Sequence, residues 1–395
     1  MIDHLLSISA ACIIGLNVLS TLGLLTARTK FTRILISTIL LGLTSVFQYT
    51  FTTWYQNRMH RGLAASIFWA YLLSSTELLL ISDVGFKDAP EPSNGLLSWR
   101  NIKWAIFLSW NMRRVGTKWE VKNIPSFSGG RTKSKEVPSA TQFIRKRLLI
   151  VVLASLFLDA ITSGPPPDME MFSEEKQYLN FARLSQVDLE ELITRVILTM
   201  TITLNAALPI MITYYVASII LVATGLNTPA ELPPLYGPLL ECYSVRRFWG
   251  LLWHQWLRRS LTGIAASVTT SLSIPRQSNL YRVTSLLIVF AISGCIHQLS
   301  DLAIGIPQFE ANGFYFFMLQ PLAIVFEDAF ESLYFRYFRR EGGIYGRLRT
   351  WEYVICFLWV VLYFTVLAPI WFWPAVRHTD PTRDSFLLVR IVPFK

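Results

Sequence analysis

Three polar residues recur at intervals of four in an apolar stretch of the C-terminal half of the chain. Ser293, His297 and Asp301 would lie on one face of a helix, because residues i, i+4 and i+8 stack along its axis. A carboxylate one turn from an imidazole can accept its N–H and raise its basicity, as a general base for a substrate hydroxyl requires. The spacing therefore predicts catalytic roles for His297 and Asp301, with Ser293 as a substrate-binding residue.

An ionisable residue within a membrane-spanning helix is a candidate functional site, because burying it in hydrocarbon is costly. Gly294 precedes His297 by three residues and would leave space beside the ring. The alternative is that His297 is only a buried interhelical hydrogen-bonding residue. Asp301, for its part, could be an ordinary residue at the membrane boundary.

A second candidate region runs from Arg246 to Arg259 and combines basic residues with tryptophans. Aromatic rings favour the lipid headgroup level, and arginines bind phosphate, either of lipid or of a phosphorylated cofactor. An interfacial helix would explain this composition without any further function. His254, which lies among the tryptophans, instead indicates the entrance of a pocket that opens to the cytosol.

Acidic and amide residues recur in the apolar stretch from Phe314 to Phe335. Gln320, Glu327 and Glu331 share a helical face, and Asp328 follows Glu327. We expect these acids to form structural ion pairs at the cytosolic rim with a set of arginines: Arg246, Arg247, Arg336 or Arg339. A further acid at membrane depth, Glu77, has no partner that the sequence identifies.

The apolar stretches that would position these residues are long enough to cross a bilayer. The chain is 52% hydrophobic and only 16% charged, so we predict an all-α polytopic membrane bundle forming one domain over residues 1–395. Eight spans are expected: Leu5–Thr26, Ile34–Tyr55, Leu63–Ser82, Leu148–Ser163, Leu192–Thr224, Val283–Ile304, Phe314–Phe335 and Trp351–Trp373.

The distribution of loop charge predicts the orientation of the spans. Residues 111–147 hold ten Lys or Arg against two acids, whereas residues 164–191 hold seven acids against two basic residues. Basic loops stay in the cytosol, so the first loop is assigned to the cytosol and the second to the lumen, with both termini lumenal. The net charge of +10 therefore indicates a lipid surface and not nucleic acid.

The usual signatures of other chemistries are missing from the sequence. The four cysteines are far apart and lack metal-ligand spacing, so we expect neither a disulfide framework nor a metal site. There is no nucleophile elbow, phosphate-binding loop, zinc-protease motif or dinucleotide fingerprint. These absences leave an activity in which a histidine acts on an activated donor that a second substrate supplies.

Three segments resemble the membrane-bound O-acyltransferase superfamily, in its wax-synthase-like branch, which includes fungal enzymes that acetylate terpenoid and meroterpenoid alcohols. They are Arg247-Phe-Trp-Gly-Leu-Leu-Trp-His-Gln-Trp-Leu-Arg258, Ser293-Gly-Cys-Ile-His297 and Gly116-Thr-Lys-Trp-Glu-Val-Lys-Asn-Ile-Pro125. The resemblance covers about residues 95–375, a catalytic region between N-terminal spans in 1–95 and a short tail in 376–395.

The resemblance implies acyl transfer from coenzyme A to an alcohol inside a tunnel in the bundle. His297 matches the family's catalytic histidine, and His254 would orient the thioester or support charge on its carbonyl. Gln320 would contact the substrate, and a set of residues would hold the coenzyme: Arg246, Arg247, Trp253, Arg258 and Arg259. The family also places the coenzyme A entrance on the cytosolic side.

The resemblance favours acetyl-CoA as donor and a small hydrophobic terpenoid or meroterpenoid alcohol as acceptor, in the membrane of the endoplasmic reticulum. A wax or sterol ester synthase that uses long-chain acyl-CoA is the alternative within the same class. A proton-coupled carrier could also use a histidine and acids inside the membrane, but the sequence shows no repeat symmetry. A purely structural membrane protein is the remaining alternative, and no oligomeric state is predicted.

Overall fold

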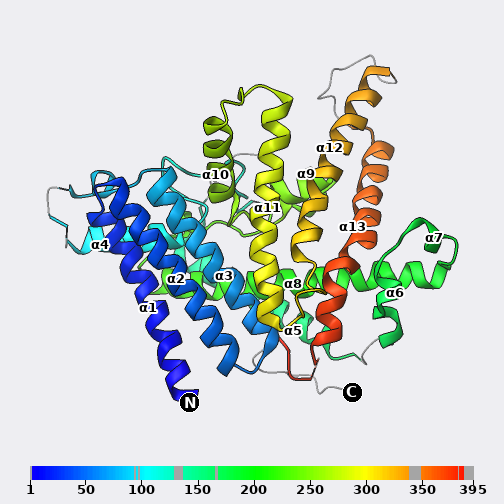
Figure 1. Ribbon diagram of the computed structural model, residues 1–395, viewed down its shortest axis with the longest axis horizontal. Helices are drawn as coiled ribbons and strands as arrows, with labels where there is room; N and C mark the ends of the chain where they lie inside the picture. Colours follow the sequence, from blue (N-terminus) through cyan, green and yellow to red (C-terminus); the bar gives the residue numbers. More distant parts are fainter. Residues whose placement is uncertain are drawn as a thin grey trace. The chain divides into compact units, whose positions relative to one another are not determined.

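Helices make up all the regular secondary structure in the described part of the computed structural model (Figure 1). The described residues are 2–92, 95–96, 98–128, 137–164, 168–337, 348–380 and 382–386. Parts of three predicted loops and of the tail lie outside them: Gly129–Glu136, Pro165–Pro167, 338–347 with Arg339, and 387–395. Within the described residues, the predicted all-α class is confirmed.

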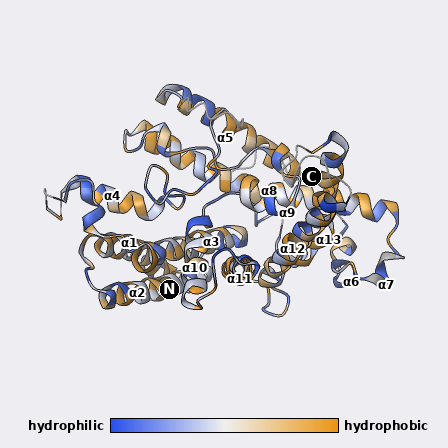
Figure 2. Cartoon of the chain, turned by 90° about the horizontal axis from the view of Figure 1, so that it is seen from above, coloured by the Kyte–Doolittle hydropathy of each residue, from blue (hydrophilic) through white to orange (hydrophobic). Residues whose placement is uncertain are grey.

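Among the described residues, seven helices are long and apolar enough to cross a membrane. Figure 2 shows hydrophobic residues along spans such as α1 and α2. The seven are α1 Ile2–Thr26, α2 Lys30–Trp54, α3 Arg58–Thr76 extended by the π-helical turn η1 Glu77–Ile81, α8 Leu189–Ala223, α11 Asn279–Ile304, α12 Gly313–Tyr337 and α13 Thr350–His378. They match seven of the eight predicted spans.

The fourth predicted span, Leu148–Ser163, forms part of a helix that is not among these seven. This helix, α5, covers Ala140–Thr162 and carries Arg145, Lys146 and Arg147 before its apolar half. Arg147 is buried in the protein, where its guanidinium lies 4.4 Å from the ring centre of Tyr215 on α8. The fourth span therefore stays a prediction.

The chain forms two compact units. Unit 1 comprises Met1–Val121 and Trp256–Met318, and unit 2 comprises Lys122–Gln255 and Leu319–Lys395. The single domain predicted for 1–395, with its regions 1–95, 95–375 and 376–395, stays a prediction.

Unit 1 packs its first three spans around an apolar core that includes Leu16, Leu40, Tyr71 and Leu78. It also contains α4 Trp99–Trp110 and α10 Arg258–Ser271, and the latter lies beside α11 (Figure 1). Polar side chains join the spans, as where Ser20 donates to Ser75 at 3.1 Å. Such interhelical hydrogen bonds are typical of helices packed in lipid.

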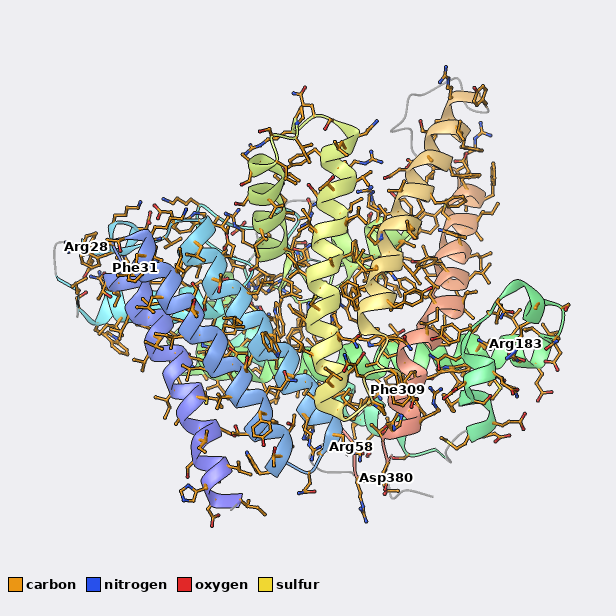
Figure 3. All side chains as sticks on the ribbon, viewed as in Figure 1. Arg28, Phe31, Arg58, Arg183, Phe309 and Asp380 are labelled. Carbon is orange, nitrogen blue, oxygen red and sulfur yellow. The ribbon has the colours of Figure 1, made fainter. Side chains whose placement is uncertain are left out.

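The end of α11 is defined by backbone conformation. Gly305 adopts φ +94°, the left-handed cap that glycine reaches without steric cost, and its N–H bonds to the Leu302 carbonyl at 3.1 Å. Figure 3 labels Phe309, which follows in the loop and is 85% exposed. This short loop brings the chain back into α12, whose first residues belong to unit 1.

Unit 2 contains α5, α8, α13 and most of α12, together with short helical segments. The short segments are η4 Met169–Phe172, α6 Glu174–Gln177, α7 Phe181–Leu184, η5 Pro229–Glu231, η6 Leu239–Glu241, α9 Val245–Arg247 and the π-helical turn η7 Phe248–Leu252. Hydrogen bonds fix the acidic loop onto α13: Gln177 donates to the Ile370 carbonyl at 3.0 Å, and Arg377 donates to Gln177 at 2.9 Å.

Candidate active site

His297 lies on α11 against an aromatic ring of the following helix. Its imidazole is parallel to the ring of Phe317, with 4.3 Å between ring centres and an interplanar angle of 3°. Phe317 is buried, so it fixes the plane of the imidazole. A face-stacked contact leaves the ring edge, where both nitrogens lie, outside the contact. This geometry is compatible with proton transfer at a ring nitrogen.

Asp301 is buried one turn further along α11 and contacts the start of α12. Its carboxylate accepts a hydrogen bond from the Gly313 N–H at 2.9 Å, and Gln298 accepts one from the Phe314 N–H at 3.1 Å. Carboxylates stabilise helix N-termini, which carry unsatisfied N–H groups. Asp301 therefore holds α12 against α11, while the predicted hydrogen bond to His297 stays a prediction.

Two glycines allow α11 and α12 to approach at the level of His297. A Cβ on Gly313 would lie 2.9 Å from the carbonyl carbon of His297, and one on Gly294 would lie 3.1 Å from the Cα of Phe314. The space expected beside the ring at Gly294 is therefore occupied by Phe314. Ser293, on the same turn, is buried. Small residues at such crossings are typical of membrane helices.

The partners of Glu77 are arginines far away in the sequence. Glu77 is fully buried, and Arg114 contacts it at 3.3 Å and Arg259 at 3.2 Å. Arg259 also donates to Ser82 at 2.8 Å, and Ser82 is hydrogen-bonded to Glu77. Burial lowers the pKa of Arg114 to about 10, and Glu77 opposes the shift, so this guanidinium stays protonated at neutral pH.

The two predicted coenzyme-binding arginines of unit 1 differ in their surroundings. In this structure Arg259 binds a buried carboxylate, so it holds α10 against η1. The neighbouring Arg258 is partly buried, and this burial lowers the pKa of its guanidinium.

In unit 2, α12 holds the segment that begins at Val245. Arg246 donates to both oxygens of Asp328, as expected for an ion pair at this rim, and Arg247 pairs with Glu241. Glu327 instead accepts from the backbone N–H groups of Val245 at 2.7 Å and of Arg246 at 3.2 Å. It also accepts from the Trp359 indole at 2.9 Å.

Gln320 is fully buried and holds the π-helical turn η7, which follows Val245 and Arg246 in the chain. Its side-chain oxygen accepts from the Trp249 indole and from the Tyr363 hydroxyl, both at 3.1 Å. The Trp253 ring is stacked on Phe248, with ring centres 5.5 Å apart. Gln320 therefore positions residues 245–254, called the tryptophan segment from here on, and its predicted contact with substrate stays a prediction.

The segment from Leu232 to Gly237 was not predicted as part of the site. The Tyr236 ring lies 5.6 Å from Trp253 and 6.4 Å from His254, and its hydroxyl donates to the Ala207 carbonyl of α8 at 2.9 Å. Burial raises the pKa of this hydroxyl, so it remains protonated. The Pro-Pro-Leu-Tyr-Gly-Pro run was the available signal, since such runs form fixed turns.

Gly237 makes the contact between that segment and η7 possible. Its N–H donates to the Leu252 carbonyl at 3.0 Å, and a Cβ would overlap the carbonyl oxygen of Leu251. Trp253 and His254 follow directly, so their backbone is fixed by this contact.

The ten predicted site residues divide between the two units. Unit 1 holds Arg258, Arg259, Ser293, His297 and Asp301, whereas unit 2 holds Arg246, Arg247, Trp253, His254 and Gln320. Within the described residues, no group of three or more His, Cys, Asp or Glu side chains could hold a metal ion.

Comparison with known proteins connects both histidine segments to one family. Residues 232–319, which include His254 and His297, match the model of the membrane bound O-acyl transferase family. Acetyltransferase ataH of Aspergillus terreus is 30% identical over 292 residues, 71% of this chain and 91% of that protein. Acetyltransferase pyr8 of Aspergillus fumigatus is 29% identical over 346 residues, 84% of this chain and 78% of that protein.

A third relative, acetyltransferase TRI7 of Fusarium sporotrichioides, is 27% identical over 344 residues, 83% of this chain and 76% of that protein. No solved structure matches the chain. The helical spans and the histidine inside one of them are consistent with the acyltransferase family that the family model and these relatives indicate. The chain is an integral membrane O-acyltransferase that belongs to the membrane-bound O-acyl transferase family.

Proposed function

We propose that this enzyme transfers an acetyl group from acetyl-CoA to a hydroxyl of a hydrophobic terpenoid or meroterpenoid alcohol. The observation that carries the proposal is His297, whose imidazole is held flat against Phe317 in a membrane-spanning helix. The relatives named as acetyltransferases support acetyl as the transferred group. Membership of an acyltransferase family favours this reaction over a proton-coupled carrier.

In the proposed reaction, His297 takes the proton of the acceptor hydroxyl as its oxygen attacks the thioester carbonyl carbon. The C–O bond forms, the C–S bond breaks, and the imidazolium returns the proton to the departing thiolate. A thioester is already activated, so the enzyme must mainly align the reactants, move one proton and exclude water. His254 would orient the thioester or stabilise negative charge on its carbonyl oxygen.

Arginines would bind the phosphates of the donor, because their planar forks match phosphate oxygens. Three of the four candidates, Arg246, Arg247 and Arg259, bind carboxylates in this structure. A phosphate would have to replace an acid at each of them. We keep all four arginines as candidates for binding the donor phosphates, with Trp253 beside the coenzyme.

We place the enzyme in the endoplasmic reticulum membrane with the coenzyme A entrance toward the cytosol. The support is the contrast between the basic loop at 111–147 and the acidic loop at 164–191. Acyl-CoA is a cytosolic metabolite, so this orientation supplies the donor directly.

The test is thiol release and ester formation by microsomes that contain the enzyme. Acetyl-CoA and palmitoyl-CoA are each offered with terpenoid alcohols, sterols and fatty alcohols. We expect acetyl esters of a terpenoid alcohol, and a loss of about 10²- to 10⁴-fold in kcat for His297→Ala, as removal of a general base predicts.

Three results would overturn parts of the proposal. A preference for palmitoyl-CoA would make the enzyme a wax or sterol ester synthase. Full activity of purified His297→Ala protein would remove the general-base mechanism. Failure of the purified wild-type protein to bind any acyl-CoA would exclude the donor class.

A further inference from the structure

The side chain of Gln255 is buried and its amide orientation is fixed. It is 2% exposed, and its NH₂ group donates to the carbonyl of Asn123 at 3.0 Å and to that of Gly250 at 3.3 Å. A glutamine NH₂ has two donors, so both are used. Carbonyl groups only accept hydrogen bonds, so the amide cannot be turned around without losing both contacts.

The fixed amide leaves its oxygen buried with no hydrogen-bond partner among the described residues. Almost all buried polar atoms in folded proteins have a partner, because an unsatisfied one costs free energy. A functional group that is satisfied only when a ligand binds is one explanation of such an atom. The oxygen of Gln255 is an acceptor, so that ligand must offer an N–H or O–H.

The two carbonyls that hold Gln255 belong to two of the three motifs, the Gly116–Pro125 segment and the Arg247–Arg258 segment that contains Gln255 itself. Asn123 lies in the Gly116–Pro125 segment and adopts φ +63°, a left-handed conformation that asparagine tolerates better than most residues. Gly250 lies in the π-helical turn η7, and this turn ends directly before Trp253 and His254. π-Helical turns are frequent at functional sites. Gln255 therefore joins these motifs and presents one free acceptor next to His254 in the sequence.

We infer that the side-chain oxygen of Gln255 binds an amide N–H in the pantetheine arm of the acyl-CoA donor. The inference rests on the proposed function. The pantetheine arm carries two secondary amides between the thioester and the phosphates. The hydroxyl of the acceptor alcohol is another possible donor, but in the proposed reaction its proton goes to His297. The N–H of the coenzyme therefore fits the remaining acceptor.

The test compares acetyl-CoA with analogues in which one pantetheine amide is replaced by an ester, so that an N–H becomes an oxygen. Each amide is replaced in turn, and wild-type and Gln255→Leu enzymes are assayed with every donor. For the wild type, loss of the bonded N–H should lower kcat/KM about 5- to 150-fold, as an unsatisfied buried acceptor predicts. For Gln255→Leu, acetyl-CoA and that analogue should react equally well.

A matched control is Gln177→Leu. Gln177 is also 2% exposed, but its NH₂ donates to Ile370 and its oxygen accepts from Arg377. This variant should lose stability and still distinguish acetyl-CoA from the analogue as the wild type does. Both donors are compared within one variant, so partial misfolding lowers both kcat/KM values equally. It therefore cancels from the ratio of kcat/KM for acetyl-CoA to kcat/KM for the analogue.

The outcomes separate this inference from the proposed function. If Gln255→Leu distinguishes the donors as the wild type does, or if no ester replacement affects the wild type, the inference is wrong. A rise only in the KM for the alcohol would assign the oxygen to the acceptor hydroxyl instead. If wild-type enzyme transfers no acyl group from acetyl-CoA or palmitoyl-CoA, the proposed function fails first and the inference fails with it.

Discussion

Two carboxylates on membrane-spanning helices, Glu77 in unit 1 and Glu327 in unit 2, obtain their hydrogen bonds in different ways. Glu77 is fully buried and binds the guanidinium groups of Arg114 and Arg259. Glu327 is partly buried and binds two backbone N–H groups and the Trp359 indole. The first site matches charge with charge, whereas the second satisfies a charge with neutral donors.

The difference shows that an acid in an apolar helix indicates a need for hydrogen-bond donors and does not indicate an ion pair by itself. Burying a charge is costly unless it is paired or hydrogen-bonded, and both arrangements meet that condition. They differ in what they hold together. Glu77 joins helices through side chains, whereas Glu327 fixes the backbone at the start of the tryptophan segment.

The largest expected effect comes from removing the charge at the first site. Glu77→Gln would leave Arg114 buried without its counter-ion, so the free energy of unfolding should fall by about 3–5 kcal/mol. Thermal unfolding of the detergent-solubilised enzyme measures this loss. Glu91→Gln is the control, because Glu91 pairs with the exposed Arg100 and such pairs contribute about 0–1 kcal/mol. Equal stabilities of the two variants would contradict the charge-matched description.

In unit 2, we expect stability to depend on the close fit between Gly237 and the backbone of η7 and not on charge. Gly237→Ala would force a Cβ into the carbonyl of Leu251, at a cost of about 3 kcal/mol because backbone cannot rotate away as a side chain can. Gly250→Ala is the control in the same segment, since a Cβ there would meet no other group of the described residues within 4 Å. Thermal unfolding should separate the variants. If both are equally stable, the contact between Gly237 and Leu252 does not hold the segment.

A smaller loss is expected at Glu327. Glu327→Gln keeps the shape but turns an NH₂ donor toward a backbone or indole donor, so it should cost about 1.5–3 kcal/mol. Because the segment it fixes leads to Trp253 and His254, the KM for acyl-CoA should also rise. Glu331→Gln, one turn along α12, should leave that KM unchanged. A rise of the same size in both variants would assign the effect to net charge on α12.

Apolar length predicted the spans well, because a helix that crosses lipid must satisfy its backbone internally and expose apolar side chains. The span within α5 stays a prediction, because α5 is not among the seven apolar helices and its Arg147 is buried against aromatic rings. Helical periodicity also placed Ser293, His297 and Asp301 on one face. It could not show that the carboxylate of Asp301 binds the Gly313 N–H, which lies twelve residues further along the chain.

The partners of the candidate site residues could be predicted only in part. The pair of Arg246 and Asp328 was among the expected combinations, because both lie at the predicted rim. The partners of Glu77 were not predictable, since Arg114 and Arg259 are 37 and 182 residues away. No spacing rule covers contacts made by tertiary packing. Gly237 was missed for the same reason, because its importance depends on the backbone that it approaches.

The smallest effect tests whether the backbone contacts of Glu327 matter more than its indole contact. Trp359→Phe removes one neutral hydrogen bond and keeps an aromatic ring, so it should cost about 1 kcal/mol and leave the KM for acyl-CoA unchanged. The double variant with Glu327→Gln measures how far the two losses overlap. If Trp359→Phe alone raises the KM as much as Glu327→Gln does, then the position of α13, and not the cap on Val245 and Arg246, sets the tryptophan segment.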